Sequence, residues 1–269
     1  MSNKYLTLTI LFLHLFHCVS SSIFNATSII ILEKHPIVGQ LLLVERTVSP
    51  GYNFSRVTLL IPSVSIGLNA ACTSFGTGGI TTYLDMQRSV DGRYLLFPCY
   101  NASLNTVLAT ALTKERVIAR VDSNGIVDTT TALKDCSTIN SHTSIASRDG
   151  SSYYISIYLE GIRYALHGGT TSTRIVAAAV MPTANRVGLW FGELWASGAA
   201  GNPQATRGYV RIGSGAAPTT LTTVIKSLPG YMTVTQQAQA LLCVGFEFIS
   251  PYTLGGSCDS SADGYDYYQ

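Results

Sequence analysis

The sequence predicts an all-β fold of repeated antiparallel units, and three observations support this prediction. Only 12% of the 269 residues are charged, while the chain contains 24 glycines and 15 tyrosines. Glycine permits tight turns, and tyrosine favours strands. Asp-Gly and Asn-Gly dipeptides stand between apolar runs, which is the pattern of β-hairpins. A short turn motif also recurs along the chain.

The N-terminal segment has the three parts of a secretory signal peptide. Lys4 supplies a positive charge, residues 6–19 form an apolar stretch, and residues 20–22 are serines. We expect cleavage after Ser21 or Ser22, so that residues 1–22 are the signal and residues 23–269 form the mature domain. The alternative is an uncut N-terminal anchor. No later apolar run reaches the ~18 residues of a spanning helix, so we expect a secreted, extracellular protein without a stable membrane span.

Two further features are typical of exported proteins. The first is a set of three N-glycosylation sequons, at Asn25, Asn53 and Asn101. The second is the set of five cysteines that remain after signal removal. An oxidising compartment favours disulfides, and five cysteines form at most two. With one cysteine left free, fifteen arrangements are open. The five are Cys72, Cys99, Cys136, Cys243 and Cys258.

The recurring motif is Ser-x-Asp-Gly followed by aromatic or aliphatic residues. Its glycines are 58 and then 114 residues apart, and 114 is twice 57. An intermediate stretch, residues 187–195, has the same strand–Gly–strand character without the aspartate. We expect repeat units near residues 87–101, 145–168, 185–198 and 259–269. The predicted turn residues are Asp91, Gly92, Asp149, Gly150, Asp263 and Gly264.

Other hairpins fill the intervals between these units. Residues 122–125, Asp-Ser-Asn-Gly, predict a turn between two apolar runs, and Glu160-Gly161 predicts another. Several strands with turns at short intervals indicate an all-β domain. Residues 103–112 have a composition that also suits a helix.

The stretch Ser-Val-Asp-Gly-Arg-Tyr-Leu at residues 89–95 resembles the strand-entry motif of β-propeller blades in the YVTN and TolB-like groups. Residues 117–129 and 161–164 look like blade hairpins of secreted propeller-like proteins. The resemblance covers roughly residues 40–269. It implies a β-propeller-like fold of repeated antiparallel four-stranded blades, without a defined chemistry.

The end of the chain suggests that the set of blades is incomplete. Gln269 lies within the last Ser-x-Asp-Gly unit, and a propeller closes by pairing its last blade with its first. The odd number of cysteines fits a lost partner. We therefore expect a C-terminally truncated product of a longer propeller. The alternative is a native end with a loose tyrosine-rich tail.

Signals for catalysis and metal binding are weak. No Gly-x-Ser-x-Gly motif is present, and the mature histidines His35, His142 and His167 select no triad. Acidic residues near Gly125 and Gly264 lack the spacing of a calcium loop. No basic run marks nucleic-acid binding. We expect no catalytic residue, metal, cofactor or nucleic-acid partner.

Aromatic residues are the better functional indication. Trp190 and Trp195 flank the Phe-Gly pair at residues 191–192, and Trp suits recognition surfaces. We expect an extracellular binding or structural module, with Trp190 and Trp195 as ligand-contact candidates. The partner is a glycan, a cell-wall polymer or a protein. The alternatives are a propeller-type hydrolase or lactonase, and a non-functional gene fragment.

Overall fold

The computed structural model describes most of the chain between residues 28 and 268. Within these residues the chain forms 18 strands and no helix, which confirms the all-β prediction. The signal-peptide segment lies outside the described residues. The described residues are 28–34, 38–47, 55–74, 85–107, 113–136, 142–158, 160–177, 181, 184–198, 208–214, 223–225, 241–250, 253–260 and 264–268.

The strands form five antiparallel sheets, and in each sheet the hydrogen-bonded order follows the chain order. The first sheet contains β1 (Ser28–Lys34), β2 (Leu41–Thr47) and β3 (Ser55–Leu60). The second contains β4 (Gln87–Arg88), β5 (Tyr94–Tyr100), β6 (Arg116–Asp122) and β7 (Val127–Leu133). The third contains β8 (His142–Ala146), β9 (Ser152–Ile157), β10 (Gly161–Leu166) and β11 (Thr173–Ala177). The fourth contains β12 (Ala184–Trp190), β13 (Glu193–Gly198), β14 (Gly208–Ser214) and β15 (Thr223–Ile225). The fifth contains β16 (Leu241–Ser250), β17 (Thr253–Ser260) and β18 (Gly264–Tyr268).

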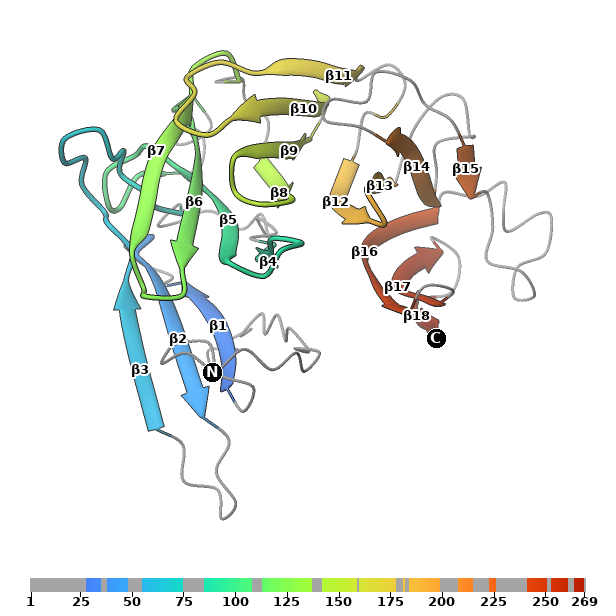
Figure 1. Cartoon of the computed structure of the whole chain (residues 1–269), viewed down its shortest axis with the longest axis horizontal. Helices are drawn as coiled ribbons and strands as arrows, with labels where there is room; N and C mark the ends of the chain where they lie inside the picture. Colours follow the sequence, from blue (N-terminus) through green and yellow to red (C-terminus); the bar gives the residue numbers. More distant parts are fainter. Residues whose placement is uncertain are drawn as a thin grey trace.

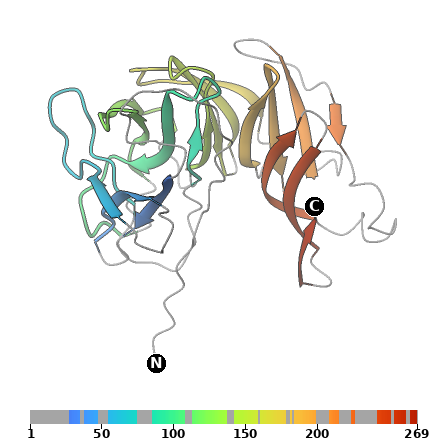
Figure 2. The ribbon, with the colours of Figure 1, turned by 60° about the horizontal axis from the view of Figure 1, so that its bottom comes forward.

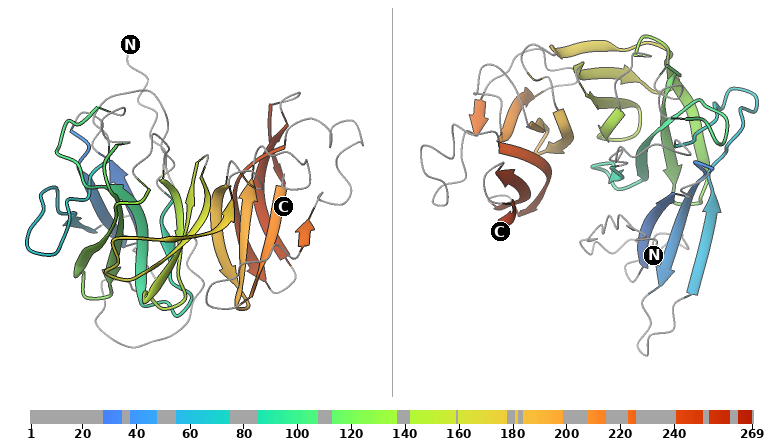
Figure 3. Two further views of the ribbon diagram at one scale, coloured as in Figure 1. Left: turned by 90° about the horizontal axis from the view of Figure 1, so that it is seen from above. Right: turned by 180° about the vertical axis from the view of Figure 1, so that it is seen from behind.

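The five sheets follow one another around an arc, with the first and fifth sheets at its two ends (Figure 1). The first strands of the later sheets, β4, β8, β12 and β16, lie nearest the middle of this arc. Figures 2 and 3 show the same succession from other sides. Among the described residues, no helix is long and apolar enough to cross a membrane.

Successive sheets pack face to face, and the core lies in the layers between them. Leu95 and Phe97 of β5 belong to the layer between the first and second sheets, whereas Leu96 belongs to the layer between the second and third. Tyr153 and Tyr154 of β9 likewise point into different layers. Strands buried on both faces read as continuous apolar runs, which explains why β5 and β9 do not alternate cleanly in sequence.

One disulfide is formed among the described residues. Cys72, in the segment after β3, is bonded to Cys99 of β5, and their Cα atoms lie 5.2 Å apart. The neighbouring residues Thr73 and Tyr100 form a β-bridge. This confirms that the chain carries a disulfide and ties the first sheet's exit segment to the second sheet. Cys136 is a buried free thiol.

The repeat differs in part from the expected one. Gly92 and Gly150 lie in turns between the first and second strands of their sheets, each with φ of +77°. Gly264, however, begins β18, the third strand of its sheet, and Asp263 lies outside the described residues. The place equivalent to Gly92 is taken in the fourth sheet by Gly192. Ser-x-Asp-Gly encodes a turn but not its place in the sheet, which is why the third copy does not continue the series.

The spacing of the sheets is also uneven. Their first strands begin at residues 28, 87, 142, 184 and 241, so the intervals are 59, 55, 42 and 57 residues. The shared value near 57 therefore does not hold for the step from the third to the fourth sheet. The turn at residues 122–125 lies between β6 and β7 as expected. Residues 103–107 are not helical, and residues 108–112 lie outside the described part.

Candidate functional site

The turns between the first and second strands of the second, third and fourth sheets share one build. In the second sheet, the Ser89 hydroxyl donates to Asp91 Oδ1 (2.7 Å) and accepts from the Tyr94 N–H (3.0 Å). The Gly92 N–H donates to the Ser89 carbonyl (2.8 Å). Serine and aspartate side chains stabilise turns by such local hydrogen bonds. The motif therefore holds its turn rigidly.

Direct contacts connect these turns in series. The N–H groups of Val90 and Asp91 donate to the carbonyls of Ser147 (3.1 Å) and Arg148 (2.9 Å). The Arg148 guanidinium in turn donates to the carbonyl of Gly192. Residues 89–93, 147–151 and 190–193 thus form one continuous surface, which we call the turn strip.

The turn strip presents apolar and cationic side chains to solvent. Phe191 is 73% exposed and Val90 is 63% exposed. Arg93 and Arg148 are exposed as well, and Arg93 is paired with Asp91 at 2.5 Å. The ring of Phe191 packs edge-on against Trp190, with centroids 4.9 Å apart. Aromatic and arginine side chains together are the composition enriched at protein recognition surfaces.

Phe191 is an exception to local backbone preference. It has φ of +46°, and Gly192 follows with +78°. These two residues form the tip of a two-residue hairpin between the paired residues Trp190 and Glu193. Positive φ at both central positions suits Asn, Asp and Gly, whereas for other L-residues it costs about 1–2 kcal/mol. Because Phe191 is mostly exposed, core burial does not offset that cost.

The sequence-predicted tryptophans lie in different places. Trp190 is the last residue of β12 and adjoins the turn strip through its contact with Phe191. Trp195 lies within β13, opposite Gly188 of β12 and Arg211 of β14. Sequence analysis missed Phe191 itself. The signal was the Phe-Gly pair between two strand-like segments, where an Asp-Gly or Asn-Gly pair is usual.

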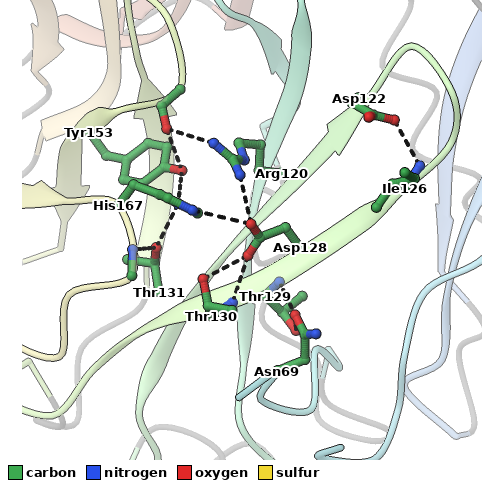
Figure 4. A network of polar contacts seen from close by, with 12 residues as sticks. Asn69, Arg120, Asp122, Ile126, Asp128, Thr129, Thr130, Thr131, Tyr153 and His167 are labelled. Atoms are coloured by element: carbon green, nitrogen blue, oxygen red, sulfur yellow. Dashed lines mark hydrogen bonds and ion pairs between the residues drawn. The ribbon is translucent and has the colours of Figure 1, made fainter. Parts of the chain in front are cut away.

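Behind the turn strip, four side chains connect the second and third sheets (Figure 4). Arg120 of β6 and Asp128 of β7 meet Tyr153 of β9 and His167, which follows β10. Asp128 Oδ2 lies 2.7 Å from the Arg120 guanidinium and 3.2 Å from His167 Nε2. Asp128 Oδ1 accepts from the N–H (2.9 Å) and hydroxyl (2.7 Å) of Thr130. We call Arg120, Asp128, Tyr153 and His167 the inter-sheet clamp.

The clamp also holds the middle turn of the strip. Arg120 and the Tyr153 hydroxyl both donate to the Gly150 carbonyl, at 3.1 and 3.0 Å. His167 Nδ1 lies 3.0 Å from the Tyr153 hydroxyl and 3.5 Å from that of Thr131. Both ring nitrogens of His167 and both oxygens of Asp128 therefore have partners inside the protein. In this arrangement the pair positions two sheets against each other rather than presenting a free base.

Both ionisable partners of the clamp have a pKa below the ordinary value. Burial alone would raise the pKa of Asp128, but hydrogen bonds from Thr130 and the charges of His167 and Arg120 outweigh it. Burial lowers the pKa of His167, the Arg120 charge lowers it further, and Asp128 opposes this. The carboxylate and the neutral imidazole are thus the forms that the folded protein favours.

A second polar cluster lies at the middle of the arc. The Gln87 amide of β4 lies 2.7 Å from Asp85, 2.6 Å from the Ser144 hydroxyl of β8 and 2.6 Å from the Val187 carbonyl of β12. The Ser144 hydroxyl also donates to Asp85 (2.8 Å), and Arg186 lies 3.3 Å from that carboxylate. The cluster joins the first strands of three successive sheets.

Acidic residues that resemble a calcium loop have other roles. Asp122 accepts from the N–H groups of Asn124 and Ile126, both at 2.9 Å, and so caps its own turn. Asp128 belongs to the clamp. Across the described residues, no group of three or more His, Cys, Asp or Glu side chains is placed to hold a metal ion.

Of the three sequons, Asn25 and Asn53 lie outside the described residues, and Asn101 follows β5. Asn101 Nδ2 donates to Glu115 (2.7 Å), and its Oδ1 accepts from the Ser65 hydroxyl (3.1 Å) and the Ala71 N–H (3.2 Å). A glycan replaces one of the two Nδ2 hydrogens, so the other can still donate to Glu115. Glycosylation is therefore compatible with this network.

Replacing Ser103 with alanine separates the glycan from the network. Ser103 is exposed, and its substitution destroys the sequon without touching Asn101. In protein secreted from a eukaryotic host, we expect Ser103→Ala to lose one glycan in intact mass and to keep its stability. Asn101→Ala should lose the same glycan and about 1–2 kcal/mol of stability, because it also removes the hydrogen bonds. Identical glycan masses for Ser103→Ala and wild type would contradict the assignment.

Comparison with known proteins finds no protein-family model that matches the chain and no curated protein that matches it. What the turn strip binds is therefore inferred from its residues and contacts.

Proposed function

We propose that the chain is a secreted binding module of β-propeller type, which holds an extracellular ligand on the turn strip. The sheets supply the blades in this proposal. Support comes from antiparallel sheets of three or four strands in chain order, packed face to face with first strands innermost (Figure 1). The Cys72–Cys99 disulfide fits an oxidising, extracellular setting.

Phe191 is the single observation that carries the binding proposal. An exposed aromatic residue at positive φ reduces stability and gains little burial in the free protein. Such outliers concentrate at ligand-contacting sites, where a partner supplies the missing contacts. Arg148 anchors the same turn through Gly192, so the ring is presented on a fixed support. Rigid presentation reduces the entropy lost when a partner binds.

The partner classes remain a glycan, a cell-wall polymer or a protein, and one experiment addresses all three. A photo-crosslinking phenylalanine analogue at position 191 resembles the native ring. In its secreted setting, the protein should form an adduct at position 191, identified by mass spectrometry. The control position is Leu68, which is 88% exposed and outside the turn strip. Adducts that are equal at both positions, or absent at 191, would contradict binding at the strip.

Phe191→Asn tests the same proposal through stability. Asparagine tolerates positive φ far better than phenylalanine does. We expect the variant to gain about 1 kcal/mol in unfolding free energy, measured by urea titration, while retention on the ligand identified by crosslinking is lost. Leu68→Asn should leave that retention unchanged. If Phe191→Asn destabilises the protein, Phe191 has a packing role instead.

A further inference from the structure

Two cysteines of the fifth sheet face each other across a hairpin. Cys243 of β16 and Cys258 of β17 are register partners in an antiparallel pair. Residues directly opposite each other in such a pair share one face of the sheet, with Cα atoms ~4.5–5.5 Å apart. A disulfide requires Cα atoms about 4.4–6.8 Å apart. The backbone register therefore meets the distance requirement of a disulfide.

The other three mature cysteines do not compete for this pairing. Cys72 and Cys99 are bonded to each other. Cys136 is buried in the layer between the second and third sheets, whereas β16 packs against strands of the fourth sheet. The Cys136 thiol lies 3.3 Å from the Ser172 hydroxyl and 3.4 Å from Asp135. Burial raises its pKa to about 11, so the unreactive thiol form dominates at neutral pH.

We propose that Cys243 and Cys258 form a second disulfide, which closes the first hairpin of the fifth sheet. The oxidant is a disulfide-bearing protein or small molecule of the export pathway. The thiolate of one cysteine attacks that disulfide, forms a mixed disulfide and releases one thiol. The thiolate of the other cysteine then attacks the mixed disulfide and releases the second thiol, so the oxidant is reduced as the cysteines are oxidised.

This pairing selects one of the fifteen arrangements that the sequence leaves open. Cys72 pairs with Cys99, Cys243 pairs with Cys258, and Cys136 remains reduced. The odd number of mature cysteines then requires no partner outside the chain. It follows from one thiol that is enclosed between two sheets.

Peptide mapping of the secreted, unreduced chain tests the pairing. The protein is alkylated under native conditions, alkylated again after denaturation with a second, heavier reagent, and digested with chymotrypsin, which cleaves between the two cysteines at Phe246. We expect a crosslinked peptide pair that contains Cys243 and Cys258. The heavier reagent should label Cys136 alone. Labelling of Cys243 or Cys258 before reduction, or a crosslink from either one to Cys136, would overturn the proposal.

Serine variants separate the pair from general folding effects. Cys243→Ser should leave Cys258 as a new free thiol, whereas the double variant Cys243→Ser/Cys258→Ser should return to a single free thiol. The double variant should also unfold at a Tm roughly 4–8 °C lower. Cys136→Ser is the matched control, and its crosslinked peptide should be unchanged. A single variant without a new free thiol would overturn the pairing.

Discussion

Gly150→Ala is expected to lower the free energy of unfolding by about 3–4 kcal/mol. Gly150 has φ of +77°, and a Cβ at this position would lie 2.6 Å from the Tyr94 ring. That ring has little room to move, because the guanidinium of Arg120 lies 4.7 Å from its centroid and that of Arg93 lies 5.4 Å away. The variant therefore combines backbone strain with a clash against a fixed side chain. Chemical denaturation followed by tyrosine fluorescence measures the loss.

Gly168→Ala is the matched control for this prediction. Gly168 has φ of +70°, but a Cβ there would meet no heavy atom within 4 Å. The variant carries the backbone cost alone, so we expect a loss of about 1–2 kcal/mol. The difference between the two variants measures the packing around Tyr94. If both variants lose the same free energy, the turn at Gly150 is not held against the second sheet.

Asp128→Ala is expected to lower the free energy of unfolding by about 3 kcal/mol, or the Tm by roughly 6–12 °C. The substitution removes acceptors for Thr130, Arg120 and His167 at once. It also leaves the Arg120 guanidinium without its carboxylate, at a site where its side chain is 19% exposed. Losing one partner of a mostly buried pair is costly because the other charge stays desolvated.

Asp122→Ala is the control for Asp128→Ala. Asp122 belongs to the same β6–β7 hairpin and accepts two backbone hydrogen bonds, but these contacts stay within its own turn (Figure 4). We expect a loss of only about 1 kcal/mol. Equal losses for the two variants would show that the clamp contributes no inter-sheet stability.

The pH dependence of the same variants follows from the two pKa shifts. The pKa values of Asp128 and His167 are both lower in the folded protein than their ordinary values. The unfolded chain therefore binds more protons, and stability falls as pH falls. The His167 contribution begins to be lost below the ordinary histidine pKa, and the Asp128 contribution is lost as pH falls through its folded pKa. Asp128→Ala should lose less stability on acidification than wild type does, measured by thermal unfolding across pH.

Local turn chemistry was readable from the sequence, but the place of each turn in the fold was not. The Asp-Gly and Asn-Gly pairs predicted the turns at Gly92, Gly125 and Gly150, because positive φ is a property of the residue itself. The same chemistry at Gly264 belongs to another part of its sheet. Phe191 escaped prediction for the opposite reason, since its conformation opposes the local preference.

The sequence by itself determined that the chain forms antiparallel strands joined by tight turns, because strand propensity and positive φ act within a few residues. The tertiary structure alone decided which side chains meet. Asp128 and His167 are 39 residues apart, and they come together only when the second and third sheets pack. Cys243 and Cys258 become neighbours only through the register of β16 and β17. Such contacts depend on packing and register between separate elements, which no local pattern encodes.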